Sequence, residues 1–193
     1  MAARRPASHV EVRVALLRGI NVGGNRKVPM SQLRVLAQQL GSGNVATHIQ
    51  SGNVVFTADG DAAAAERQLE QAIELHFGFV VPVIVRSAAA WLRAAANCPF
   101  AEAAVERPQL VHLGFSKQKP RAGAGKDLAP YCTAGEEVVL RGDAIWIDYR
   151  GGVARSKLTP AVLDRAIGST VTLRNHKTVQ AIAELVRAAA SPA

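Results

Sequence analysis

A loop rich in glycine and asparagine, residues 18–27, has the composition of a ligand-binding segment. It carries the cations Arg18, Arg26 and Lys27 and runs directly into an expected helix. A guanidinium can grip a phosphate or carboxylate through two parallel hydrogen bonds, whereas an ammonium acts as a point charge. Glycine allows close backbone approach, and a helix start favours an anion. The loop residues expected to contact such a ligand are Arg18, Gly19, Asn21, Gly23, Gly24 and Lys27.

The spacing of this loop differs from that of the common phosphate-binding motifs. It is neither a Walker A loop nor a dinucleotide fingerprint, and no acidic residue follows about 20 positions later to hold a ribose. A structural loop, in which asparagine and glycine serve the turns, explains the same residues equally well. The sequence leaves both interpretations open.

Polar residues at three later positions could add ligand contacts. They lie at an expected turn between two strands and ahead of two expected helices: Gln50, Ser51, Asn53, Ser156, Lys157, Arg174 and Asn175. Turn formation alone explains the first group, and an N-cap role alone explains Asn175. In the functional interpretation Lys157 and Arg174 lie beside the first loop as further anion contacts.

Groups suited to catalysis or metal binding are sparse. The five histidines show no metal-ligand spacing, no carboxylate pair stands close together, and Cys98 and Cys132 lack a neighbouring cue for a nucleophile. We therefore assign no catalytic residue, expect no metal or cofactor, and leave open whether the protein is an enzyme.

The charge of the chain is unevenly distributed. The net charge is +8, yet residues 12–58 and 107–126 contain no Asp or Glu, and residues 149–183 contain only Asp164. One positive face would attract an anionic partner, foremost a small phosphate-containing ligand. Nucleic acid is the alternative, although only Phe56 offers an aromatic ring on an expected central strand. A protein-interaction module or homodimer without catalysis is the third possibility.

Hydrophobic periodicity predicts an α+β protein in two parts. In the first half, strands at 10–17, 45–50, 53–57 and 79–85 and helices after Pro29 and Asp61 give the order βαββαβ of a ferredoxin-like unit. The second half is expected to hold a helix, a strand, a hairpin and two further helices, the last beginning near Asn175. We therefore expect a ferredoxin-like lobe over 1–86 and a smaller α/β lobe over 87–193, ending in a helix.

Four blocks of the sequence resemble the bacterial family DUF1697. They are LLRGINVGGNRKVPM at 16–30, QSGNVVF at 50–56, RSKL at 155–158 and TLRNHKTV at 172–179, in the order of the family. The last block departs from the family pattern, because His176 and Lys177 stand where Trp and Asn are usual. The resemblance implies an α/β fold with a ferredoxin-like part and implies no activity, since the family has no established function.

The compartment is inferred from hydropathy and cysteine use. No run of 18 apolar residues is present, and the N-terminal residues lack the apolar stretch of a signal peptide. The two cysteines, far apart and without a partner motif, are typical of reduced thiols. We expect a soluble cytoplasmic protein that does not engage membranes.

Overall fold

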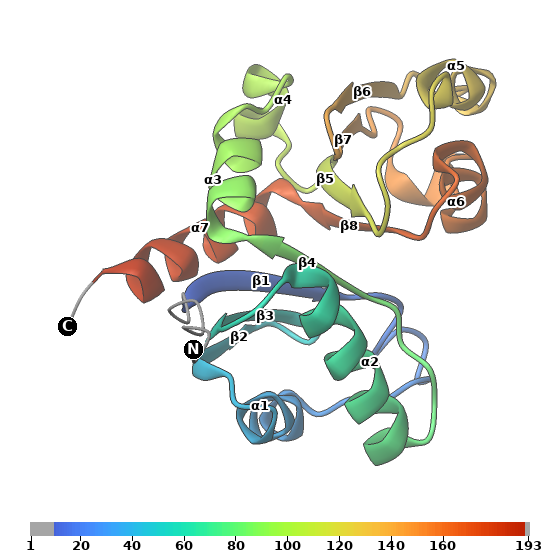
Figure 1. The fold of residues 1–193 in the computed structure, drawn as a ribbon. Helices are drawn as coiled ribbons and strands as arrows, with labels where there is room; N and C mark the ends of the chain where they lie inside the picture. The colour runs from blue at the N-terminus through green and yellow to red at the C-terminus, as the bar shows by residue number, and fades with distance from the viewer. Residues whose placement is uncertain (1–9, 192–193) are drawn as a thin grey trace, which may run out of the picture.

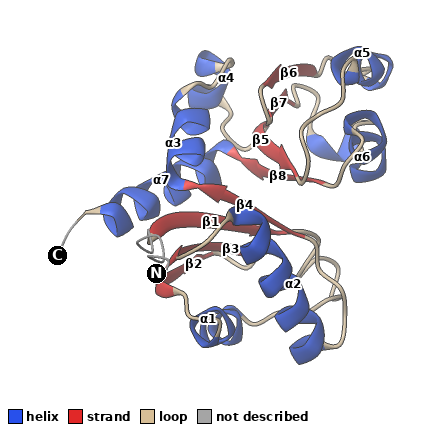
Figure 2. Ribbon diagram, viewed as in Figure 1, coloured by secondary structure: helices blue, strands red, loops and turns tan. Residues whose placement is uncertain are grey.

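Residues 10–191 form a mixed α+β structure, described by a computed structural model, with two four-stranded antiparallel sheets and seven α-helices (Figures 1 and 2). The first lobe contains β1 (Glu11–Leu17), α1 (Met30–Gln39), β2 (Gly43–His48), β3 (Asn53–Ala58), α2 (Ala62–Phe77) and β4 (Val83–Ser87). Its strand order is β2-β3-β1-β4, which places β4 at an edge as Pro82 beside it predicts.

The second lobe repeats this arrangement. It contains β5 (Val111–Ser116), α5 (Ala124–Leu128), β6 (Glu137–Arg141), β7 (Ala144–Asp148), α6 (Pro160–Ile167) and β8 (Val171–Asn175). Its strand order, β6-β7-β5-β8, matches that of the first lobe with β5 in the place of β1. The lobes are topologically equivalent, although no internal repeat is evident in the sequence.

Three further helices connect the lobes: α3 (Ala88–Ala96), α4 (Ala101–Glu106) and α7 (His176–Ala190). Helix α7 packs against β1, β2 and β3 of the first sheet, opposite α1 and α2 (Figure 1). Buried side chains of both sheets meet α3 and α7 in one shared core, which includes Leu16, Trp91, Phe115, Trp146 and Ile182. Each lobe also has a core of its own beneath its two helices.

Local signals in the sequence set several of these boundaries. The side chains of Asp61, Thr159 and Asn175 each accept a hydrogen bond from a main-chain N–H in the first turn of α2, α6 and α7. Gly78 and Gly168 end α2 and α6 in the left-handed conformation. The helix expected after Asp61 and the one expected to begin near Asn175 are confirmed.

Other elements differ from expectation. The sequence interpretation has no counterpart of β8, because its Arg and Asn break the apolar pattern, or of the short helices α4 and α5. The part expected to be the smaller carries a complete four-stranded sheet. The lobe boundary after residue 86 stays a prediction; β4 ends at Ser87, and the shared core joins residues on both sides of it.

Among residues 10–191, no helix has both the length and the apolar character needed to cross a bilayer.

Candidate functional site

The basic loop folds as a small exposed hairpin. Val22 pairs with Asn25, whose N–H donates to the Val22 carbonyl oxygen at 3.2 Å. Gly23 and Gly24 form the tip, with φ of +59° and +79°, and a Cβ added at either position would meet no atom within 4 Å. Two successive positive φ values characterise the tightest hairpin turns, so these glycines serve the turn. Residues 22–27 are all exposed.

The cations of the loop differ in their environments. Arg18 is largely buried and pairs with Asp164 of α6 at 2.6 Å, which joins the first lobe to the second. Arg26 and Lys27 are exposed, and within the described part of the chain neither forms an ion pair. Pro29 occupies the N-cap of α1 without a side-chain cap, and the first turn holds no acidic residue. The two free cations therefore adjoin an uncapped helix start.

Asn21 holds the loop closed and ties it to the β2–β3 turn. Its side-chain amide donates to the carbonyl oxygens of Val28, at 3.0 Å, and Gln50, at 2.7 Å, and its Oδ1 accepts from the Val28 N–H at 2.9 Å. Gly52 packs so closely here that a Cβ would lie 2.6 Å from the Leu17 Cβ. The two N-terminal candidate segments are thus brought together.

Arg174 reaches into the same place from β8. Its side chain is buried, with 8% of the residue exposed, and in residues 10–191 it faces no carboxylate. The guanidinium donates to six neutral oxygens: Leu17 O (2.8 Å), Ser51 O (2.9 Å), Gly52 O (3.3 Å), Leu173 O (2.8 Å), Thr172 Oγ1 (2.8 Å) and Asn53 Oδ1. Burial lowers the pKa of Arg174 to about 10, which leaves it charged at neutral pH.

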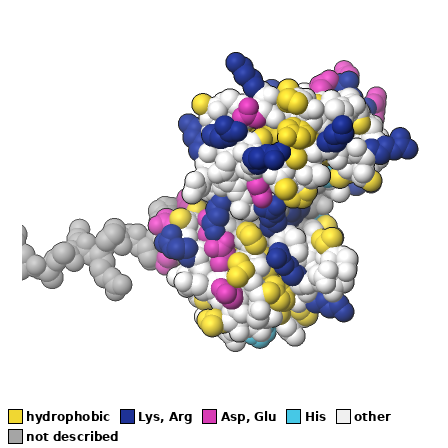
Figure 3. Space-filling view, turned by 90° about the vertical axis from the view of Figure 1, so that its right-hand side faces the viewer, with side chains coloured by type: hydrophobic (Ala, Val, Ile, Leu, Met, Phe, Trp, Pro, Cys, Tyr) yellow, Lys and Arg dark blue, Asp and Glu magenta, His cyan; other side chains and the backbone are white. Residues whose placement is uncertain are grey.

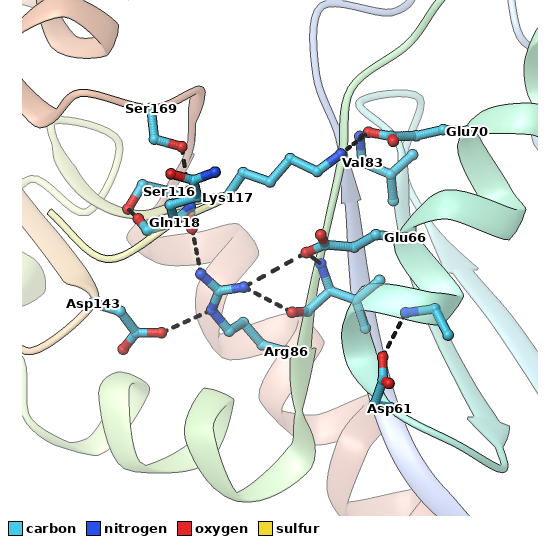
Figure 4. A network of polar contacts seen from close by, with 12 residues as sticks. Asp61, Glu66, Glu70, Val83, Arg86, Ser116, Lys117, Gln118, Asp143 and Ser169 are labelled. Atoms are coloured by element: carbon cyan, nitrogen blue, oxygen red, sulfur yellow. Dashed lines mark hydrogen bonds and ion pairs between the residues drawn. The ribbon is translucent and has the colours of Figure 1, made fainter.

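An equivalent contact between the lobes, the Arg86 joint, lies around Arg86 (Figure 4). Arg86 precedes the N-cap of α3 in β4 as Arg174 precedes the N-cap of α7 in β8. It donates to the last residue of β5, Ser116 O, and to Asp143 Oδ2 in the β6–β7 turn at 2.8 Å. Each lobe therefore sends an arginine to the first-strand end and the hairpin turn of the other.

A cross-lobe ion pair accompanies each arginine. Lys117, directly after β5, pairs with Glu70 of α2, and Glu70 also accepts from the Val83 N–H at 2.9 Å. In the same way Arg18, directly after β1, pairs with Asp164, which accepts from the Val171 N–H at 2.9 Å. Arg18, the first residue predicted from the sequence to contact an anion, is therefore one partner of an ion pair that holds the lobes together.

The remaining candidates lie elsewhere or cap a helix. Asn175 Oδ1 accepts from the Thr178 N–H at 3.0 Å, and Ser156 Oγ accepts from the Leu158 N–H at 3.1 Å. Burial alone would raise the pKa of Glu136, but the Ser156 hydroxyl, main-chain N–H groups and, least of these, the charge of Lys157 hold it below its usual value. Ser156 and Lys157 therefore face Glu136 in the second lobe.

The chemistry open to these residues is electrostatic. Burial raises the pKa of both Cys98 and Cys132, so neither thiol is activated as a nucleophile. No group of three His, Cys, Asp or Glu residues in the described part could hold a metal ion. Phe56 is 1% exposed, and helices cover both faces of its sheet, which leaves no aromatic platform for bases.

Comparison with known proteins identifies the family. The family described as "Protein of unknown function (DUF1697)" matches residues 10–146. This chain belongs to the DUF1697 family. The conserved bacterial protein SP0830 from Streptococcus pneumoniae has a similar structure, with a TM-score of 0.68 and 21% identity over 92% of this chain and 99% of that one. At this identity the likeness concerns the fold. No curated protein matches the sequence significantly.

Three of the four blocks that resemble DUF1697 meet at the β2–β3 turn. Asn21 donates to Gln50 O, and Arg174 donates to Gly52 O; the two C-terminal blocks lie beyond the matched range. His176, which replaces the usual Trp, packs near Trp146 with ring centroids 6.3 Å apart.

The Arg86 joint was missed by sequence reasoning. The signal that could have found it is an arginine directly before a helix N-cap, which occurs at both Arg86–Ser87 and Arg174–Asn175.

Proposed function

We propose that this DUF1697 protein binds a small phosphate-containing anion at the exposed hairpin of residues 21–27. The observation that supports it is the pair of exposed cations Arg26 and Lys27, which have no acidic partner among the described residues and adjoin the uncapped start of α1. Unsatisfied N–H groups and the positive end of the helix dipole favour an anion there. Lys and Arg side chains are spread over the face shown in Figure 3, several of them near the waist between the lobes with Asp and Glu side chains among them.

The proposal narrows the set of contacts expected from sequence. Arg18 and Arg174 are removed from that set, because each binds groups of the other lobe. Asn21 is removed because its side chain holds the loop closed. Arg26, Lys27 and the open Gly23–Gly24 backbone are the groups left to meet a ligand. A ferredoxin-like description of the first lobe is part of the same proposal, supported by its βαββαβ order and its strand order.

The test is a thermal-unfolding screen of the full chain against pyrophosphate, nucleotides, sugar phosphates, dicarboxylates and short oligonucleotides. A ligand at 100 times its Kd stabilises one site by about 2.7 kcal/mol, which raises Tm by roughly 5 to 10 °C at this size. The double variant Arg26→Ala/Lys27→Ala should abolish the shift. Arg67→Ala/Arg187→Ala removes the same charge from two exposed helical positions and should retain it.

Each outcome decides the proposal. A shift with a small phosphate compound that only the loop variant loses supports it. A shift that the loop variant keeps, or no shift with any compound, overturns it. A shift with oligonucleotides alone, lost steeply as salt rises, overturns it in favour of nucleic-acid binding.

A further inference from the structure

A shallow hollow of about 560 Å³, wide open to solvent, lies between the lobes beside the edge strand β4 and the Arg86 joint; it is called the cleft below. It is lined by Ala62, Val85, Arg86, Ser87, Ala90, Lys117, Lys119, Gly142 and Asp143. These residues come from the starts of α2 and α3, the end of β4, the segment after β5 and the β6–β7 turn. Its volume lies in the range of small-molecule sites.

Three cations of the cleft, Arg86, Lys117 and Lys119, are balanced by three carboxylates, Asp143, Glu66 and Glu70, but the pairing is uneven and leaves Lys119 without a partner among the described residues. Asp143 is bound by Arg86, and Glu66, behind the lining, also faces Arg86 at 3.8 Å. Lys117 pairs with Glu70, but its ammonium has three N–H donors and this one carboxylate partner among the described residues. Lys119 is exposed and has no ion pair within residues 10–191. Lys119 and the spare donors of Lys117 are therefore free to bind an anion.

The start of α3 adds positive electrostatic potential at the cleft. Ser87 caps the helix by accepting from the Ala90 N–H at 3.2 Å, which leaves the two preceding N–H groups without a cap. The first turn of this nine-residue helix contains no acidic residue. Ser87 and Ala90 both line the cleft, so the positive end of the helix dipole borders it.

The floor of the cleft is apolar. Ala62 and Ala90 are half-buried and present methyl groups to the cleft, above the fully buried Val85. A phosphate at the lysines would place an attached organic group over these side chains. The lining thus fits an organic phosphate better than free phosphate.

The equivalence of the lobes relates this cleft to the basic hairpin. The segment after β5 is the counterpart of residues 18–27 after β1, and both stretches are basic and free of acid. In each, the first cation, Lys117 or Arg18, is held in a cross-lobe pair. Of the later cations, Arg121 pairs with Asp127, whereas Arg26, Lys27 and Lys119 have no ion pair among the described residues. We propose that the inter-lobe cleft is a second anion site, which takes a small organic phosphate monoester through Lys119 and Lys117. It uses residues separate from those of the hairpin and stands independently of the proposed function.

The test uses phenyl phosphate and inorganic phosphate as probes on the full chain, by isothermal titration and by amide chemical-shift mapping. Phenyl phosphate should bind more tightly than inorganic phosphate and shift the amides of residues 88–90 and 117–119. Loss of one charged contact should weaken binding about tenfold, so Lys119→Ala should raise Kd about tenfold and Lys119→Glu further. Ala90→Met, which fills the floor without changing charge, should weaken phenyl phosphate and spare inorganic phosphate.

The hairpin variant Arg26→Ala/Lys27→Ala serves as the control and should leave the cleft affinity unchanged. The proposal is overturned if Lys119→Glu binds phenyl phosphate as the wild type does. It is equally overturned if the hairpin variant abolishes binding, or if the two probes bind with equal affinity. Since each site has its own variants, failure of one proposal is distinguishable from failure of the other.

Discussion

Replacing Arg174 with methionine should destabilise the protein more than any change at a surface cation. Methionine replaces the aliphatic stem of arginine only as far as Nε and leaves the oxygens of Leu17, Ser51 and Gly52 without the donor they share. A buried polar group left unpaired costs about 1–3 kcal/mol, and removal of the buried charge offsets part of the sum. We expect Arg174→Met to lower the free energy of unfolding by about 3–5 kcal/mol.

Urea unfolding at neutral pH measures this loss, and thermal unfolding should show Tm lower by roughly 6 to 20 °C for a chain of this size. Arg187→Met, at an exposed position of α7, is the matched control and should stay within about 0.5 kcal/mol of the wild type. Arg174→Lys keeps the charge but offers fewer donors without the planar fork, so it should recover little stability. A loss below about 1 kcal/mol for Arg174→Met would refute the structural role of this joint.

Two further predictions concern the same structure. Gly52→Ala should cost about 1–3 kcal/mol more than Gly24→Ala in urea unfolding, because both have positive φ but only Gly52 would press a Cβ against Leu17; equal losses would contradict the close packing. Burial raises the pKa of Glu66 above its ordinary value of 4.5, so between these two values the folded state binds more protons than the unfolded state. The free energy of unfolding therefore falls as pH rises from 4.5 through the raised pKa. Glu66→Gln keeps an oxygen for the Val85 N–H and should flatten this fall in unfolding measured from pH 4.5 to about 7; an unchanged pH profile would exclude Glu66 as its source.

The fold was predictable where local pattern and burial agree. Leu33, Leu36 and Ala37 recur at helical spacing and form the buried face of α1, and Thr159 followed by Pro160 is a typical helix start that begins α6. Strand β8 was not predictable, because it contains an arginine at a buried position where the strand pattern expects an apolar residue. Arg174 is buried only because carbonyl oxygens of the other lobe accept hydrogen bonds from it. A contact between residues so far apart in sequence leaves no periodic signal.

The candidate site was predictable in its parts and not in its assembly. Asparagine and glycine at 21–24 indicated a turn or a site, and the structure shows a turn. The meeting of residues 21 and 50 could not be derived from spacing, since it depends on how the loop closes over the sheet. The pairing of Arg18 with Asp164 depends on the packing of two lobes, which no local pattern encodes.

The structural roles found at the joints sharpen the functional question. Arg174 uses its N–H donors in hydrogen bonds between the lobes, so its role in stability is enough to explain why an arginine stands there. A cation that stays exposed without a carboxylate in the described structure, such as Arg26, Lys27 or Lys119, gains little stability from its position. Ligand binding is therefore best sought at these free cations, and the duplicated joints supply the rigid frame that would hold them in place.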